Sequence, residues 1–209
     1  MGQYLEIHKD NPQARLISQA ATILRRGGVI VYPTDSCYAL ACHIGDKTAM
    51  DRIIRLRQLG ERHNMTLICR DLSEISSFAK VGNAEFRLIK SLTPGPYTFL
   101  LKATRDVPKR LQHPKRKTIG IRIPDNKIAQ DLLDSLGEPL ISTSLILPGD
   151  EFPMNEPDEI NQRLIKEVDL IIDGGHGGIS ETTVLDLTMD EPHVVREGLG
   201  EISNLLDLD

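Results

Sequence analysis

Residues 29–40 read VIVYPTDSCYAL, and this stretch sets the pattern for the rest of the chain. The apolar residues 29–32 predict a short buried strand, and Pro33 ends it because proline has no N–H to donate to a neighbouring strand. Three small side chains that carry oxygen follow at once, in residues 34–36. Ligands of open α/β sheets bind at the carboxyl ends of strands, so Thr34 is a candidate binding residue. A simple Asp/Ser turn is the alternative interpretation.

Apolar periodicity places helices between further strands. The spacing predicts a helix over residues 11–26, with Asn11 as its cap and Pro12 at its first position. Asp46 and Asp125 are the predicted caps of two more helices. The other predicted helices are 72–79, 83–91 and 158–166, and the other predicted strands are 65–69, 97–102, 118–124, 139–141, 168–172, 182–187 and 193–196.

This alternation predicts the α/β class, with helices flanking one main sheet. Two pairs of strands follow one another without a helix between them, 182–187 with 193–196 and 97–102 with 118–123. Such neighbours favour antiparallel pairing, so we expect a mixed parallel/antiparallel sheet.

Length and composition indicate a single domain over residues 1–209, with a short acidic tail at 201–209. The sequence has neither an N-terminal signal pattern nor an apolar run near the ~18 residues of a membrane helix. The cysteines, Cys37, Cys42 and Cys69, are odd in number and lack a zinc spacing. We therefore expect free thiols in a cytoplasmic protein without a membrane partner. A Cys37 nucleophile is the less favoured alternative.

Charge is divided unevenly along the chain. Residues 148–209 hold 16 acidic and 3 basic side chains, whereas residues 1–147 hold 14 acidic and 22 basic ones. The densest basic segment is 102–127, which predicts contact with a phosphate-rich ligand or a nucleic acid. A solvated loop is the alternative. The candidate RNA-binding residues are Lys109, Arg110, Lys115, Arg116 and Lys117.

Two predicted strands present hydroxyl or guanidinium groups. In 118–124, TIGIRIP, three isoleucines face the core and Arg122 lies on the opposite face, which otherwise carries small residues. The strand at 139–141 runs into the hydroxyls of Ser142 and Ser144. Thr183 is a further candidate on a strand. We expect these groups to bind substrate or nucleotide, although Arg122 on a solvated face is an alternative.

Three other arginines are candidate anion-binding residues: Arg55, Arg57 and Arg196. Residues two apart in a helix point about 200° from each other, so Arg55 and Arg57 reach one anion only if the helix ends near Arg55. Two surface arginines at a helix end are the alternative. Arginine binds phosphate and carboxylate in a bidentate manner, which suits catalysis by positioning and charge neutralisation.

Familiar catalytic motifs are missing from the sequence. It contains no GxxxxGK, HExxH, paired CxxC or GxSxG pattern, and its one GxG, at 198–200, is too weak to use. The arginines and strand-end hydroxyls therefore remain as the candidate chemistry, and we expect no tightly bound cofactor or metal.

Several ordered segments resemble the YrdC/YciO family, the threonylcarbamoyl-AMP synthase superfamily, and most closely its YciO branch. They are GGVIVYPTDSCYAL, RLRQL, TPGPYTFLLKA, TIGIRIPD, GEPLISTS, TTVLDLT and VVREGLG, and they span about residues 10–200. The resemblance implies a twisted α/β sheet with a cationic concave surface. It implies an enzyme that joins L-threonine, bicarbonate and Mg²⁺-bound ATP into threonylcarbamoyl-AMP for tRNA modification, a nucleotidyltransferase reaction.

The family's motifs are partly altered here. Its Lys-x-Arg falls on residues 55–57, and its Lys-Pro falls near His63-Asn64. Its Ser-x-Asn falls on 144–146, where Ile146 cannot form a side-chain hydrogen bond. These changes imply a weak synthase with Arg55 and Arg57 in the catalytic role. The alternative is a paralogue that binds double-stranded RNA, tRNA or nucleotide without efficient synthase activity. The oligomeric state stays open.

Overall fold

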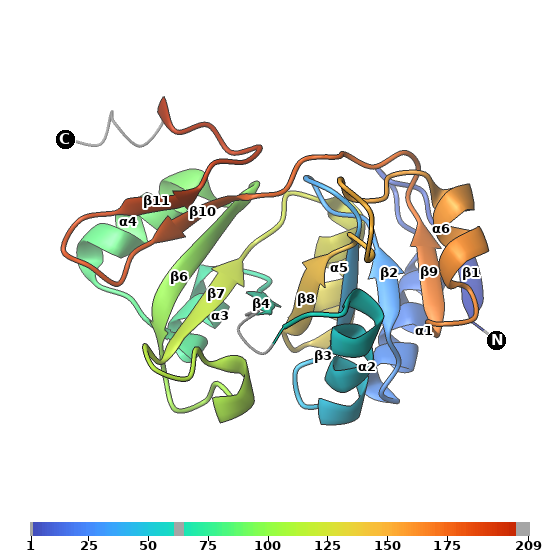
Figure 1. Ribbon diagram of the computed structural model, residues 1–209, viewed down its shortest axis with the longest axis horizontal. Helices are drawn as coiled ribbons and strands as arrows, with labels where there is room; N and C mark the ends of the chain where they lie inside the picture. The colour runs from blue at the N-terminus through green and yellow to red at the C-terminus, as the bar shows by residue number, and fades with distance from the viewer. Residues whose placement is uncertain (1, 61–64, 204–209) are drawn as a thin grey trace.

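The computed structural model describes residues 2–60 and 65–203 (Figure 1). The predicted site at His63-Asn64 and most of the predicted acidic tail lie outside these ranges. The described chain forms one mixed sheet, flanked by six α-helices, with ten strands in the order β1-β9-β2-β3-β8-β4-β7-β6-β10-β11 and β5 paired to β6. The α/β class and the mixed sheet are thereby confirmed.

The strands are short and differ in direction. β1 and β9 pair in parallel, β2 pairs antiparallel with β3, and β6 lies between antiparallel β7 and parallel β10. Both predicted antiparallel pairs are present, β6 with β7 and β10 with β11. The strands are β1 (Gln3–Glu6), β2 (Ile30–Tyr32), β3 (Ala39–His43), β4 (Thr66–Ile68), β5 (Ala79–Lys80), β6 (Tyr97–Ala103), β7 (Thr118–Arg122), β8 (Leu140–Ser144), β9 (Leu170–Asp173), β10 (Thr183–Asp186) and β11 (His193–Arg196).

The helices follow the predicted apolar stripes, but two predicted caps are wrong. Helix α1 begins after Gln13 rather than at Asn11, and α5 is capped by Asn126, whose side chain accepts from Ala129 N, rather than by Asp125. Asp46 caps α2 as predicted. The helices are α1 (Ala14–Arg25), α2 (Lys47–Arg57), α3 (Leu72–Phe78), α4 (Asn83–Leu92), α5 (Lys127–Leu136) and α6 (Pro157–Leu164), with a 3₁₀ turn at Lys109–Leu111. None of the helices in the described ranges is long and apolar enough to cross a membrane.

The helices cover the two faces of the sheet unequally. Helices α2, α3, α4 and α6 pack with residues of β2 to β10 in one large apolar cluster. On the other face, α1 and α5 pack against β2, β3 and β9, and this second cluster includes no residue of β6, β7 or β10. Within residues 2–60 and 65–203, one half of the second face is therefore without a helix, and its strands present mostly small and polar side chains there.

Strand β9 is followed by a long crossing. The segment from 174 to 182 leads from β9 near one end of the sheet toward β10 near the other, and Figure 1 shows it passing along the upper edge. Cys37 and Ile179 form an isolated antiparallel bridge on the way. The crossing therefore brings residues near 180 beside the turn that follows β2.

Candidate functional site

A polar cavity lies on the half of the sheet that none of the described helices covers. Its volume is about 160 Å³. Strands β3, β8, β4, β7, β6 and β10 contribute the floor, because side chains opposite one another in register share one face, as Thr66, Gly120 and Ser142 do. The lining residues are Cys37, Ala39, Thr66, Ile68, Thr98, Leu100, Gly120, Arg122, Ser142, Thr143, Ser144, Glu181, Thr182, Val184 and Arg196.

Arg122 forms a buried ion pair at this cavity. Its side chain is 8% exposed, and its guanidinium contacts the carboxylate of Asp35, which is 12% exposed. The same guanidinium lies 3.4 Å from the hydroxyl of Thr34. Arg122 Nε and Asp35 Oδ2 are buried and have no hydrogen-bond partner among the described residues. Buried polar atoms are rarely left unpaired, so these two atoms indicate a place for a polar ligand or water.

The turn after β2 is fixed by the Thr34 hydroxyl. Its Oγ1 accepts from the backbone N–H groups of Ser36 and Cys37, each at 3.2 Å, and donates to Cys37 O at 2.6 Å. Thr34 is thus buried and used mainly to shape the turn. Asp35, next to it in the chain, supplies the carboxylate that meets Arg122.

Arg55 and Arg57 do not converge. Helix α2 continues to Arg57, so the two side chains leave it in different directions. Arg55 is exposed, and its Nε lies 3.4 Å from its own helix at Asp51 O. Arg57 is half-buried, its Nε has no described partner, and burial lowers its pKa while Glu181 acts in the opposite direction. Arg57 therefore interacts electrostatically with Glu181, a residue that lines the cavity.

The two serines of β8 differ in their surroundings. Ser142 is buried, accepts from Tyr32 OH and donates to Leu40 O, both at 3.0 Å. Ser144 donates to Glu181 Oε1 at 2.9 Å. Arg196, on β11, lies 3.0 Å from the other carboxylate oxygen of Glu181. Ser144 and Arg196 therefore share one internal carboxylate.

Thr183 lies on the face of β10 opposite the cavity. It is fully buried, donates to Gly200 O at 2.6 Å and accepts from Gly198 N at 3.0 Å. Its neighbour Thr182 lines the cavity and hydrogen bonds to Thr98 at 2.8 Å. Thr183 therefore joins the C-terminal segment to the sheet.

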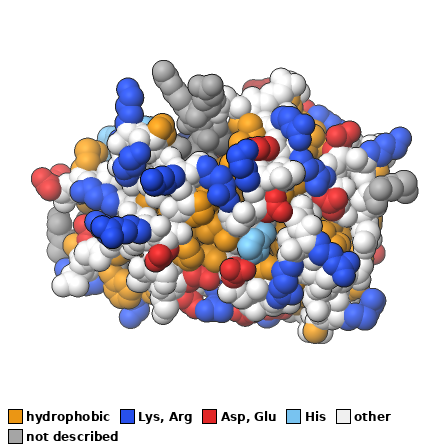
Figure 2. All heavy atoms as spheres, turned by 90° about the horizontal axis from the view of Figure 1, so that it is seen from below, with side chains coloured by type: hydrophobic (Ala, Val, Ile, Leu, Met, Phe, Trp, Pro, Cys, Tyr) orange, Lys and Arg blue, Asp and Glu red, His pale blue; other side chains and the backbone are white. Residues whose placement is uncertain are grey.

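The five residues predicted to bind RNA are exposed on the segment between β6 and β7. Lys109 and Lys117 line an open hollow of about 900 Å³ together with Lys80 and Arg105. Arg110 donates to Ile44 O, and Arg116 pairs with Asp186. Figure 2 shows a group of lysine and arginine side chains on the half of the lower face that contains the segment between β6 and β7.

The three cysteines are free and buried. Cys37 lines the cavity, but burial raises the pKa of its thiol, which leaves it protonated and a poor nucleophile. Burial also raises the pKa of Cys42 to about 12.

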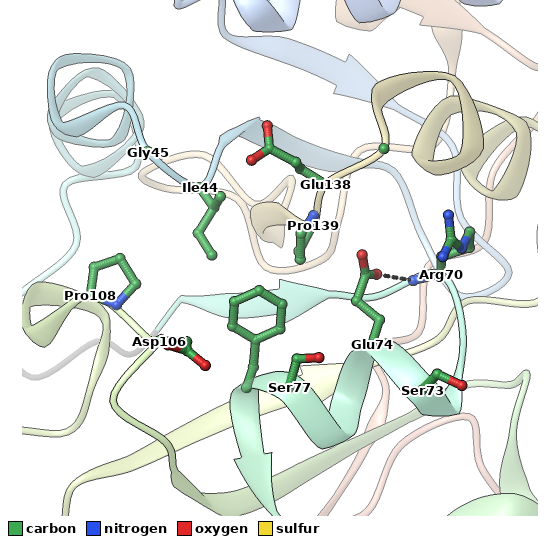
Figure 3. A pocket seen from close by; sticks show the side chains of 12 residues that line it. Ile44, Gly45, Arg70, Ser73, Glu74, Ser77, Asp106, Pro108, Glu138 and Pro139 are labelled. Carbon is green, nitrogen blue, oxygen red and sulfur yellow. Dashed lines mark hydrogen bonds between the residues drawn. The ribbon is translucent and has the colours of Figure 1, made fainter.

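A second, larger cavity lies elsewhere, between α3 and the loops that precede α2 and β8. Its volume is about 510 Å³, and Figure 3 shows Glu74, Asp106 and Glu138 around it with Ile44 and Pro108. It contains none of the residues predicted from the sequence. The candidate site is therefore the smaller cavity on the open face.

Several cavity residues were not singled out from the sequence. Thr66 and Thr98 could have been found from alternation within their strands. Thr66 of β4 lies opposite Gly120 of β7, and Thr98 lies two residues before Leu100 of β6, which is also opposite Gly120. Asp35 stood in the opening stretch without an assigned partner. No sequence pattern pointed to Glu181, since its contacts are with Ser144 of β8 and Arg196 of β11, which only the folded sheet brings near it.

Comparisons with known proteins agree with this architecture. The Sua5/YciO/YrdC family model, described as "Telomere recombination", matches residues 22–198. "Uncharacterized protein YciO" of Escherichia coli (strain K12) is 61% identical over 206 residues, which are 99% of this chain and 100% of that protein. The crystal structure of E. coli YciO has a TM-score of 0.94 and covers 98% of this chain and 99% of that chain.

Relatives with an assigned activity are more distant. The threonylcarbamoyl-AMP synthase of Stenotrophomonas maltophilia (strain K279a) is 30% identical over 170 residues, 80% of this chain and 90% of that protein. The crystal structure of P. abyssi Sua5 complexed with L-threonine has a TM-score of 0.91 at 23% identity, covers 99% of this chain and 60% of that chain, and is a likeness of fold. With a family match that extends over most of its length, the chain belongs to the Sua5/YciO/YrdC family.

Proposed function

We propose that the open-face cavity binds L-threonine and Mg²⁺-bound ATP and forms threonylcarbamoyl-AMP at a low rate. The observation that carries the proposal is the set of unpartnered buried atoms at the cavity and beside it, Arg122 Nε, Asp35 Oδ2 and Arg57 Nε. Burying such atoms unpaired costs about 1–3 kcal/mol each, and a ligand with an anionic and a donor group would remove that cost. Threonine carries both kinds of group.

The chemistry needs charge neutralisation more than a nucleophile on the protein. The amine of threonine would attack the carbon of bicarbonate with loss of water, and a carbamate oxygen would then attack the α-phosphorus of ATP, so that pyrophosphate leaves. Negative charge develops on the phosphate oxygens in the second step. We assign the stabilisation of that charge to Arg122, which lines the cavity, and to Arg57, which interacts electrostatically with the cavity residue Glu181.

The low rate follows from Ile146. The resemblance to the family puts Ile146 at the asparagine of the Ser-x-Asn motif, and its side chain can form no hydrogen bond. A buried ligand group that loses such a partner costs about 1–3 kcal/mol, which corresponds to roughly ten- to hundredfold in rate. The relatives called threonylcarbamoyl-AMP synthase support the reaction class, at about 30% identity.

Arg57→Ala is expected to lower threonylcarbamoyl-AMP formation at least tenfold, because the half-buried guanidinium beside the cavity is lost. The product would be followed by mass spectrometry after incubation with threonine, bicarbonate and Mg-ATP, with pyrophosphate measured by a coupled assay. Arg55→Ala is the matched control, since Arg55 leaves the same helix end and is exposed. Equal activity in the two variants would contradict the role of Arg57, and no product from the unmodified protein would contradict the proposed reaction.

Binding of double-stranded RNA or tRNA is a second candidate function. It is favoured by the exposed lysines and arginines around the open hollow, where Lys80, Arg105, Lys109 and Lys117 lie together. A-form duplexes are recognised largely by shape and phosphate contacts, for which such a surface is suited.

The affinity for a tRNA is expected to fall about 100-fold between 50 and 200 mM salt, as for about four phosphate contacts. The double variant Lys109→Ala/Lys115→Ala should lower the slope of log affinity against log salt by about 2. Lys9→Ala/Lys166→Ala removes the same charge from the opposite end of the sheet and should leave the slope unchanged. Affinity that does not depend on salt would exclude this function.

A further inference from the structure

The carboxylate of Glu181 lies at the candidate cavity and contacts residues of two different strands. One oxygen accepts from Ser144 Oγ at 2.9 Å, and the other lies 3.0 Å from Arg196 Nη1. Ser144 ends β8 and Arg196 ends β11, so the carboxylate connects strands that are far apart in the sheet. The Glu181 side chain remains 31% exposed.

The arginines and hydroxyls in and beside the cavity differ in whether they keep an unpartnered polar atom. Arg57 and Arg122 each keep a buried Nε without a described partner, although Arg122 also pairs with Asp35. Ser144 and Arg196 are already occupied by a carboxylate of the protein itself. An arginine and a hydroxyl that both contact one carboxylate form an arrangement that would equally bind a phosphate or a carboxylate of a ligand.

Glu181 can leave this position without unfolding its segment. Its backbone is held independently, because its carbonyl accepts from Leu199 N at 2.9 Å. Only the side chain must rotate, and it is partly open to solvent. Its negative charge also acts on Arg57, whose pKa it raises against the effect of burial.

We propose that Glu181 is a specificity-determining residue whose carboxylate occupies an anion subsite formed by Ser144 and Arg196, so that a substrate anion must displace it. The inference rests on the proposed function in taking this cavity as the substrate site. It adds that the cavity discriminates against ligands whose negative charge extends to Ser144 and Arg196. A phosphate chain and the carboxylate of an amino acid share the chemistry that would compete.

Titration calorimetry of the full chain with inorganic pyrophosphate, and separately with L-threonine, tests the inference. Glu181→Gln is expected to bind one of the two probes about tenfold more tightly than the unmodified protein, equivalent to about 1.4 kcal/mol. The gain should disappear in Glu181→Gln/Arg196→Ala, where the subsite has lost its cation. Glu159→Gln is the matched control, because it also removes one charge from a glutamate–arginine pair, with Arg163 at 3.3 Å on the surface of α6.

A tighter Glu181→Gln variant supports the inference, and the probe that gains identifies which substrate anion Glu181 opposes. Unchanged or weaker binding of both probes overturns it, as does a gain that persists without Arg196 or appears equally in Glu159→Gln. The inference is also overturned if neither probe binds to any of these variants, because an anion subsite freed of its competitor must bind an anion. These readouts do not need turnover, so a failure of the synthase reaction would appear separately, as absence of product.

Discussion

Arg122→Met is expected to lower the free energy of unfolding by about 3–5 kcal/mol, because it leaves the Asp35 carboxylate buried without its cation. Both side chains are nearly enclosed, so water cannot replace the guanidinium at little cost. The same variant should also lose threonylcarbamoyl-AMP formation by more than 100-fold. Urea denaturation gives the stability, and product mass spectrometry gives the activity.

The double variant Arg122→Met/Asp35→Asn separates these two effects. Removing both charges of a buried pair typically recovers much of the stability that is lost when one partner is removed. Activity should not recover, since the guanidinium is still absent from the cavity. Arg163→Met is the control, because its pairs with Asp150 and Glu159 lie outside the cavity and should cost about 1 kcal/mol or less. A double variant that is stable and fully active would exclude a role for Arg122 in the reaction.

Gly178→Ala is expected to lower the free energy of unfolding by about 1–3 kcal/mol and product formation at least tenfold. A Cβ at this position would lie 2.1 Å from the backbone oxygen of Ser36, which no side-chain movement can relieve. The crossing segment would have to move away from the turn after β2, and Glu181 lies three residues further along the same segment. Thermal unfolding and the product assay measure the two effects.

Gly60→Ala is the matched control for this substitution, because an added Cβ there meets nothing within 4 Å. It should change neither stability nor activity beyond small amounts. Full activity in a folded Gly178→Ala variant would show that close contact between the crossing segment and Ser36 is not needed for the site.

The fold could be predicted from the sequence where periodicity is strong. The alternating isoleucines of β7 and the apolar stripes of α2 and α4 appear at the predicted positions. Three strands were missed: β1, β3 and β5, of which β5 has only two residues, Ala79–Lys80. β3 is buried on both faces and shows no alternation of apolar and polar residues, and β1 has only four residues, of which none is buried.

The candidate site could be predicted only in part. The position of Arg122 at the cavity could be predicted, because the alternation of side chains along a strand is a local property of the sequence. The Arg122–Asp35 pair spans 87 residues and depends on the order of strands in the sheet, which local patterns do not contain. Thr183 satisfies every local criterion for a strand hydroxyl at the site, yet alternation turns it toward Gly200 on the other face.

The pairing of β1 with β9 also affects how the chain can fold during synthesis. Residues Gln3–Glu6 leave the ribosome long before their hydrogen-bonding partners, Leu170–Asp173, are made. The edge strand β1 cannot pair until its interior neighbour β9 has been made, and pairings of such large sequence separation form slowly. The nascent protein therefore carries an unpaired β1 while the residues between β1 and β9 are translated, and an unpaired strand is prone to aggregation during that period.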